Sequence, residues 1–521
     1  MGTLEGIQAG LALLLTPTSM LLIVAGLVVG FIVGVLPGFS SPNAAAILLP
    51  FSLAMAPHDA LILFAAIYSG TTFAGAVPAI LLNIPGTAGA AATTLDGRPM
   101  ALAGKVDLAI GVARSASAFG GVVGLIITLS IIGPMSLMAL RVGPPELFLI
   151  AMFGLSVIAT VVGTDVWKGL AAGLLGMLIA AISADPITAQ GRMTFGILEL
   201  YEDIPIVAAV IGLFAFNEMI QMARRGTYSG DKLARSVIGD GSAGQSSFDK
   251  VLGWVGLRNL PQLWEGVVYS ALRPFQVARA ALVGVLFGAI PGVGAAVANF
   301  VSYGIAKRRS RSPETFGKGN PDGVLASESC DSALAGGTMV PTLTLGIPGN
   351  ATTAVMLAAL YLHGIAPGPQ VMVQNAPIAY AVLLALLISS VLILPIGILL
   401  AAPMTSILAV RREVLIPLII VVSIIGAFAV RNSMVDVMIA VAFGFLGLAL
   451  KFGGFPMIPV ILGLILGPMA EGSFVRSLML GRYELSIFWA SPLSKSFIAA
   501  IVALMLFNAI QTYLGRRTAK P

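Results

Sequence analysis

Long apolar runs separated by short polar segments fill most of this chain. In the amino-terminal part they lie at 20–36, 43–56, 60–82, 107–133, 145–163, 166–183 and 204–223. After a polar stretch they resume at 277–290, 293–306, 324–347, 351–365, 377–402, 414–430, 434–450, 456–470 and 494–514. About 20 apolar residues span a bilayer as a helix, and some of these runs are too short or too glycine-rich for that. The pattern predicts an all-α polytopic membrane protein with roughly ten to fourteen membrane segments, some of them re-entrant or broken.

Two of the interrupted runs occur twice in the chain. Val77-Pro-Ala-Ile-Leu-Leu-Asn-Ile-Pro-Gly86 matches Val340-Pro-Thr-Leu-Thr-Leu-Gly-Ile-Pro-Gly349. Upstream, Gly30-Phe-Ile-Val-Gly-Val-Leu-Pro-Gly38 matches Gly284-Val-Leu-Phe-Gly-Ala-Ile-Pro-Gly292. All four segments end in Pro-Gly, which ends a helix because proline lacks a backbone donor and glycine admits positive φ. In lipid, a broken helix persists only against protein or a water-filled cavity, and matched breaks in two halves indicate a transporter's binding site.

The matching segments divide the chain into two halves. The first pair is shifted by 254 residues (Pro37 to Pro291) and the second by 263 (Pro85 to Pro348), so the second half carries nine extra residues. We therefore predict a first membrane half over 1–223, a linker over 224–276 and a second membrane half over 277–521. We favour an inverted relation between the halves, which is common where paired broken helices meet at the bilayer midplane. A parallel relation stays open.

Composition supports a membrane protein and excludes other classes. Of the 521 residues, 58% are hydrophobic and 10% are charged, whereas a soluble domain carries about 25% charged residues. The net charge of +6 lies in loops, where it bears on orientation and not on nucleic acid. A single cysteine, Cys330, excludes an internal disulfide framework. The linker has more Lys and Arg than Asp and Glu, which places it in the cytoplasm; Trp254 and Trp264 in it fit either an interfacial helix or a plain solvated linker.

A dozen short motifs in order resemble one family, the large membrane subunit of the tripartite tricarboxylate transporters (the TctA family). In the first half they are Leu36-Pro-Gly38, Asn83-Ile-Pro-Gly-Thr87, Asp96-Gly97, Gly143-Pro-Pro-Glu146, Asp185 with Arg192-Met-Thr-Phe-Gly196, and Ile211-Gly-Leu-Phe-Ala215 with Glu218. In the second half they are Ile290-Pro-Gly-Val-Gly294, Phe316-Gly-Lys-Gly319, Gly323-Val324 with Glu328, Leu345-Gly-Ile-Pro-Gly349, Pro367-Gly-Pro369, and Leu464-Ile-Leu-Gly-Pro468 with Glu471.

This resemblance implies a bacterial inner-membrane permease that imports carboxylates with an ion gradient. It also implies two partners, a periplasmic solute-binding protein and a small membrane subunit. This sequence departs from the family at one place: the family usually has two adjacent asparagines after the glutamate, where this chain reads Glu328-Ser-Cys-Asp331. An ionisable residue at membrane depth indicates function, although Asp331 could instead cap a helix near the interface.

The breaks predict where a carboxylate and a cation bind. Half-helices that begin after Gly86 and Gly349 should point free N–H groups at an anion, and both glycines should be left-handed. Residues at these tips form the predicted substrate-binding set: Ser40, Ser41, Asn43, Asn83, Gly86, Thr87, Gly349 and Asn350. Carbonyls exposed by helices that end before the prolines suit Na⁺. The predicted cation-coupling and break residues are Pro37, Gly38, Pro85, Pro291, Gly292, Asn299, Asp331 and Pro348.

Other function classes fit less well. The two histidines are isolated, so we expect no catalytic residues, no cofactor and no metal other than a transported cation, with Na⁺ favoured over H⁺. Arg114, near the start of an apolar span, could pair with an anionic substrate or snorkel to the cytoplasmic interface. A passive anion channel, or a carrier working without a binding protein, stays open as an alternative.

Overall fold

The computed structural model describes residues 3–36, 39–139, 142–162, 166–184, 190–201, 204–224, 260–291, 294–400 and 412–518. Pro37, Gly38 and Gly292 of the predicted breaks lie outside these ranges, as do Asp185 and most of the linker, including Trp254. The described chain is helical apart from one two-stranded hairpin, in which Ser183 pairs with Arg192. The prediction of an all-α polytopic membrane protein is confirmed.

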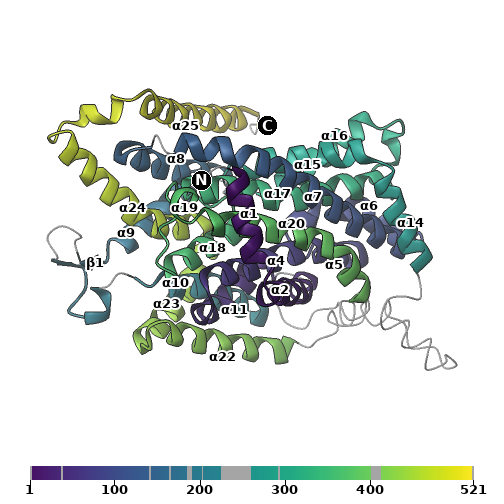
Figure 1. Ribbon diagram of the computed structural model, residues 1–521, viewed down its shortest axis with the longest axis horizontal. Helices are drawn as coiled ribbons and strands as arrows, with labels where there is room; N and C mark the ends of the chain where they lie inside the picture. Colours follow the sequence, from purple (N-terminus) through teal and green to yellow (C-terminus); the bar gives the residue numbers. More distant parts are fainter. Residues whose placement is uncertain are drawn as a thin grey trace.

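Two sets of helices build the molecule (Figure 1). The first set in the first half is α1 (Thr3–Leu14), α2 (Pro17–Val35), α3 (Ser41–Leu48), α4 (Pro57–Ala74), α5 (Ala76–Leu82), α6 (Thr94–Leu102) and α7 (Val106–Ala139), with 3₁₀ turns η1 (Pro50–Ala54) and η2 (Gly89–Ala91). Its counterparts in the second half are α14 (Leu260–Ala271), α15 (Pro274–Gly288), α16 (Ala295–Arg309), η5 (Pro313–Thr315), α17 (Pro321–Leu345), α18 (Ala351–Leu362), α19 (Val371–Gln374) and α20 (Ala376–Leu399). These helices pack mainly on one another, α7 on α17 and α20 on α4.

The second set again combines segments from both halves. From the first half come α8 (Pro144–Val162), α9 (Val166–Ala180), β1 (Ser183–Ala184), β2 (Gly191–Arg192), η3 (Leu198–Leu200), α10 (Ile206–Val210), the π-helical segment η4 (Ile211–Phe216) and α11 (Asn217–Arg224). From the second half come α22 (Arg412–Arg431), α23 (Met434–Phe452), α24 (Ile458–Leu480), η6 (Leu485–Trp489) and α25 (Pro492–Thr518). Here α24 packs on α8 and α9, α25 on α8, and α23 on η4. Figure 1 shows α24 and the β-hairpin at one end of the molecule and α14 and α16 at the other.

Seven of the described helices are long and apolar enough to cross a membrane. An eighth candidate is a helix pair, Pro261–Ala271 and Pro274–Gly288, bent by 75°. The start of this pair belongs to the predicted linker, and its Trp264 is 60% exposed. The linker boundary drawn at 276 falls within α15, which begins at Pro274.

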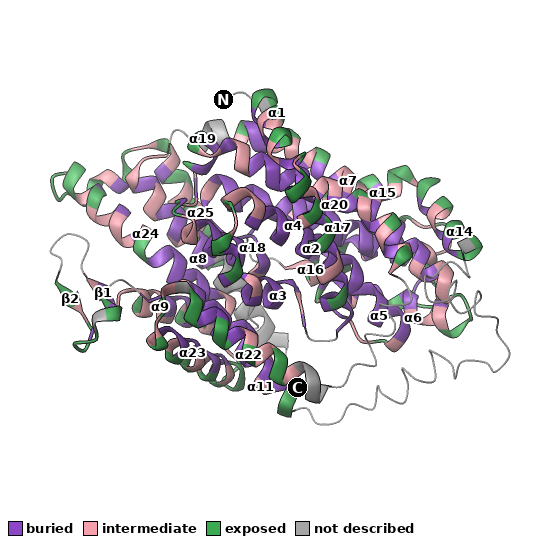
Figure 2. Ribbon diagram, turned by 60° about the horizontal axis from the view of Figure 1, so that its bottom comes forward, coloured by how far each residue is buried: buried purple, intermediate pink, exposed green. Residues whose placement is uncertain are grey.

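The helix α17 is not among the apolar spans, although it lies at the centre of the first set. Every residue from 323 to 344 is buried, including Glu328 and Asp331. Figure 2 shows buried residues along α17, α4 and α18 and exposed ones on the outer helices. A helix that is buried all round is normally apolar, so the polar residues of α17 call for an explanation beyond packing.

The helix pairs α2–α4 and α15–α17 pack in the same way. A Cβ placed on Gly30 would lie 2.6 Å from the carbonyl oxygen of Ile67. A Cβ placed on Gly284 would lie 2.3 Å from the carbonyl oxygen of Cys330, which is the counterpart of Ile67 at the 263-residue shift. The ends match as well: Asn83 has φ 59° and Gly346 has φ 71°. The two pairs differ at Gly75, where α4 ends before α5 begins, whereas α17 is continuous.

Candidate functional site

The first break follows α5 and packs tightly against helices of its own half. Asn83, which is exposed, ends α5 in the left-handed conformation. The Gly86 N–H donates to the Gly75 carbonyl at 3.1 Å, and a Cβ on Gly86 would lie 2.3 Å from the Gly34 carbonyl oxygen. Pro85 and Thr87 are half-buried. The break is therefore held by backbone contacts that leave no room for a side chain at position 86.

The second break follows α17 and is also closely packed. The Gly349 N–H donates to Thr342 Oγ1 at 3.2 Å, and a Cβ on Gly349 would lie 2.6 Å from the Thr338 Cβ. Pro348 is buried. Asn350 begins α18: its side chain accepts from the Thr353 N–H at 3.0 Å, and the Thr353 hydroxyl accepts from the Asn350 N–H at 3.0 Å.

The conformation expected for the two glycines is wrong. Neither Gly86 nor Gly349 has positive φ; the left-handed residues are Asn83 and Gly346, each just after the helix. Both glycine N–H groups are also used inside the chain, so they are not the free donors that the sequence predicted. After the first break only a three-residue 3₁₀ turn forms before α6 begins at Thr94. Both helices end before the prolines, at Leu82 and Leu345, and the glycines serve close packing.

Polar contacts between the halves join equivalent elements. Ser41 on α3 shares a 2.7 Å hydrogen bond with Thr352 on α18, and both side chains are buried. In the other direction, Asn299 on α16 donates to the carbonyl of Gly89, which is the counterpart of Thr352, at 2.9 Å. Helix α3 of the first half thus contacts α18, which follows the break at Pro348. Helix α16 of the second half contacts the segment that follows the break at Pro85. Of the neighbouring predicted residues, Asn43 and Pro291 are buried and Ser40 is half-buried.

A second equivalent pair involves Asp331 and its counterpart Tyr68. The Asn350 side-chain amide donates to the Tyr68 hydroxyl at 2.5 Å. In the other direction, the Asp331 carboxylate lies against Gly89: a Cβ there would be 2.1 Å from one carboxylate oxygen and 2.3 Å from the other. One site therefore has a neutral hydroxyl where the other has a carboxylate. The alternative that Asp331 caps a helix near the interface is wrong, because it lies inside α17 and is 4% exposed.

Glu328 lies one helical turn before Asp331 and is 1% exposed. One carboxylate oxygen accepts from the Thr93 hydroxyl, which also shares a 2.9 Å hydrogen bond with Ser327. The other oxygen accepts from Ser117 Oγ on α7 at 3.1 Å. The sequence drew attention to Glu328 only through the family motif. Its hydroxyl partners were missed because they lie 235 and 211 positions away in the chain.

Another pair of family motifs meets at Asp96. One carboxylate oxygen of Asp96 accepts from the N–H groups of Gly317 and Gly319 at 2.8 Å and of Asn320 at 2.9 Å. The other oxygen accepts from the Tyr303 hydroxyl at 2.9 Å. Asp96 is completely buried. Its carboxylate links α6 to the polar segment 308–322, which contains the nine extra residues of the second half. The contact is structural, and nothing in the sequence linked the two motifs.

Arg114 does not snorkel to the interface. It is 1% exposed, and its guanidinium carbon lies 5.6 Å from the centre of the Phe73 ring. Nε and Nη1 have no hydrogen-bond partner among the described residues. The alternative that Arg114 snorkels is therefore wrong, and the alternative that it meets an anion stays a prediction.

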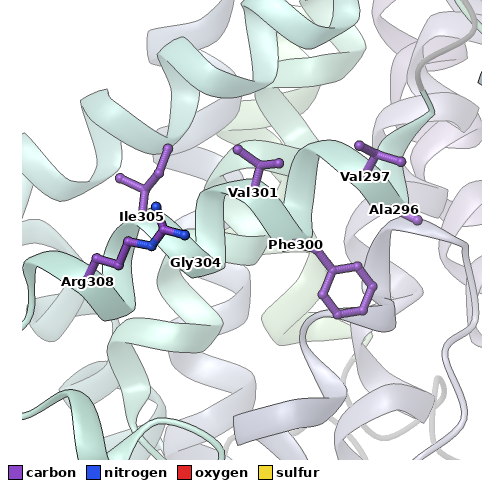
Figure 3. Close-up of a pocket in the computed structure, with 7 residues that line it drawn as sticks. All are labelled: Ala296, Val297, Phe300, Val301, Gly304, Ile305 and Arg308. Carbon is purple, nitrogen blue, oxygen red and sulfur yellow. The ribbon is translucent and has the colours of Figure 1, made fainter. Parts of the chain in front are cut away.

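Two pockets in the described part of the chain are lined by none of the predicted site residues. One, of ≈ 610 Å³, lies along a single face of α16 and is lined by Ala296, Val297, Phe300, Val301, Gly304, Ile305 and Arg308 (Figure 3). The other, of ≈ 490 Å³, is an apolar groove between α7, α14, α15 and α20. Because neither includes a predicted site residue, the chemistry of the breaks is the better guide to the site.

Comparisons with known proteins agree with the motifs. The model of the family described as "Tripartite tricarboxylate transporter TctA family" matches residues 20–462. A relative from Agrobacterium vitis, "Uncharacterized 52.8 kDa protein in TAR-I ttuC' 3'region", is 29% identical over 517 residues, which cover 99% of this chain and 98% of the relative. A second, "Uncharacterized protein in TAR-II ttuC' 3'region", is 29% identical over 234 residues, 45% of this chain and 97% of that protein. No solved structure matches.

Proposed function

Because the chain belongs to the tripartite tricarboxylate transporter TctA family, we propose that it is the permease that imports a tri- or dicarboxylate with a cation gradient. It acts with a periplasmic solute-binding protein, which delivers the substrate, and with a small membrane subunit. The membrane is the bacterial inner membrane. The family and the apolar helices support a multi-pass transport protein; the substrate, cation and binding-protein dependence are the proposal.

The single observation that carries the mechanism is the fully buried polar helix α17. It holds two carboxylates in the middle of the first helix set and ends at the second break. Its neighbours Gly89, in the first half, and Asn299, in the second, belong to segments that follow the breaks at Pro85 and Pro291. Polar residues at membrane depth are costly and mark ion or substrate pathways. The segments that follow these two breaks therefore meet beside α17.

We place the substrate carboxylates at the side chains around the breaks. Asn83, Thr87 and Asn350 supply amide and hydroxyl donors, and Ser40, Ser41 and Asn43 lie on or just before α3, beside α18. The positive end of α18 lies at Asn350, and an anion is favoured there. Gly86 and Gly349 contribute by close packing, because their N–H groups are already bonded within the chain.

The coupling cation is Na⁺ in this proposal. Backbone carbonyls near Pro85, Pro291 and Pro348 and the side-chain oxygens of Asn299 and Asp331 are its proposed ligands; the predicted break residues Pro37, Gly38 and Gly292 lie outside the described residues. Such hard oxygen ligands suit Na⁺. No resident cofactor is invoked.

Reconstitution tests the dependence on partners. The permease and small subunit are placed in liposomes with the binding protein outside, and uptake of a labelled tri- or dicarboxylate is measured. We expect accumulation above the outside concentration, lost when the binding protein is left out. Accumulation without the binding protein would favour the simpler carrier, and equilibration without accumulation would favour the anion channel.

A further inference from the structure

The carboxylates of α17 are not balanced by basic side chains. In the parts of the chain that the structure describes, the salt bridges join other residues, such as Arg192 with Glu471 and Arg431 with Asp436. Glu328 and Asp331 lie three positions apart on one helix, so their side chains are neighbours. Two like charges this close in a low-dielectric interior repel each other strongly, and each is costly to bury alone. Each carboxylate therefore needs a neutralising partner, which is either a proton or a bound cation.

The two carboxylates differ in how far their oxygens are already used. Both oxygens of Glu328 accept hydroxyl hydrogen bonds, from Thr93 and Ser117. Among the described residues Asp331 accepts no hydroxyl hydrogen bond, and its carboxylate lies against Gly89. Asp331 is thus the carboxylate with oxygens left for a ligand.

Asn299 supplies an independent indication of a ligand. It is completely buried, and its amide nitrogen donates to the Gly89 carbonyl at 2.9 Å. Its carbonyl oxygen, Oδ1, has no partner among the described residues. Turning the amide over would place Oδ1 against the Gly89 carbonyl, so the orientation is fixed by that bond. A buried acceptor without a donor takes a water or an ion as its partner, and the neighbouring carboxylate favours a cation there.

The two repeats are not equivalent at this point. The counterpart of Asp331 is Tyr68, whose hydroxyl accepts from Asn350 and carries no charge. Only one of the two equivalent positions therefore has a carboxylate.

We propose that Asp331 and Asn299 Oδ1 bind one Na⁺ ion at the contact of α17, α16 and η2, and that Glu328 strengthens binding through its charge. This site rests on the proposed function, since it would be where the cation gradient is coupled to transport. Hard oxygen ligands and a net negative charge are the features that favour Na⁺ over softer ions.

Direct binding of ²²Na⁺ to the purified full-length permease tests the site without substrate or partners. The wild type should bind ²²Na⁺ saturably at constant ionic strength in choline chloride. Asp331→Asn keeps the shape and removes the charge, and it should weaken binding by about 100-fold or more, whereas Glu328→Gln should weaken it by about tenfold. Glu471→Gln removes a carboxylate outside the site and should bind like the wild type.

The outcomes separate this site from the proposed function. Undiminished ²²Na⁺ binding by Asp331→Asn overturns the site, and so does a wild type that binds none while it still accumulates carboxylate with its partners. Binding that depends on Asp331 in a protein that accumulates no carboxylate leaves the site standing and refutes the proposed function. Circular dichroism of each variant, matched to the wild type, excludes unfolding as the cause of lost binding.

Discussion

At the scale of single residues, the breaks after α5 and α17 have the same backbone conformation but different residues. Both helices end on a residue with positive φ, Asn83 in the first half and Gly346 in the second. Asparagine is one of the few residues besides glycine that adopts this conformation readily. Asn83 is exposed, whereas Gly346 is buried against Gly368, so only the first position has room for a side chain.

Substitutions at these two positions should therefore differ in cost. Gly346→Ala is expected to lower the free energy of unfolding by about 1–2 kcal/mol, because alanine is strained at positive φ. Its Cβ would also lie 3.0 Å from the Gly368 nitrogen. Asn83→Gly should change stability by less than about 0.5 kcal/mol, since glycine adopts this conformation freely. Thermal unfolding of the purified permease measures both, and a Gly346→Ala variant as stable as the wild type would contradict this reading.

Some residues of the candidate site were predictable from the sequence and others were not, for a physical reason. The Pro-Gly pairs and Asp331 were visible because each is a local signal: a helix break or a charge in an apolar run. Thr93, Ser117 and Tyr68 were not, because a single hydroxyl side chain has no special sequence pattern, and their partners are distant in the chain. The left-handed residue was misplaced because Pro-Gly suggested glycine, whereas the turn begins earlier, at the end of the helix.

At the scale of elements, the apolar runs predicted most helices well, and α17 (Pro321–Leu345) corresponds to the run at 324–347. The nine extra residues of the second half proved harder to interpret. They fall in the polar segment 308–322, which the sequence presents as a plain loop. In the structure, Asp96 from the first half binds this segment through three backbone N–H groups.

Removing the charge of Asp96 should release that segment. In Asp96→Asn the three N–H groups lose a charged acceptor, and hydrogen bonds to a charged group contribute about 1.5–3 kcal/mol each. We expect faster cleavage by trypsin after Arg311 and Lys318 and a lower unfolding temperature. Tyr303→Phe removes one hydrogen bond to the same carboxylate and should have a much smaller effect. Equal cleavage of the two variants and the wild type would show that Asp96 does not hold the segment.

At the scale of the whole molecule, the two halves exchange equivalent contacts. Ser41 with Thr352 and Asn299 with Gly89 are one such exchange, and α7 on α17 with α20 on α4 is another. Reciprocal contacts of this kind are expected of a two-fold relation between repeats. The sequence indicated the duplication, but whether the axis lies in the membrane plane stays a prediction.

Labelling from the two sides of the membrane tests the inverted relation. Ala56 and Thr315 are both exposed and lie in equivalent segments, just before α4 and α17. In an inverted arrangement, Ala56→Cys and Thr315→Cys face opposite sides. A membrane-impermeant maleimide should therefore label Ala56→Cys in intact spheroplasts and Thr315→Cys only after permeabilisation, because the basic run at 307–311 places that segment in the cytoplasm. Labelling of both from one side would require parallel repeats.

The most direct test of the account imposes one ion gradient at a time on the reconstituted system. Permease, small subunit and binding protein are assembled in liposomes, and labelled carboxylate uptake is followed with a Na⁺ gradient alone or a pH gradient alone. We expect uptake with the Na⁺ gradient and none with the pH gradient in Na⁺-free buffer, and we expect Asp331→Asn to lose the Na⁺-driven uptake. Uptake driven by the pH gradient without Na⁺, and lost in Asp331→Asn, would contradict it and make Asp331 a proton carrier.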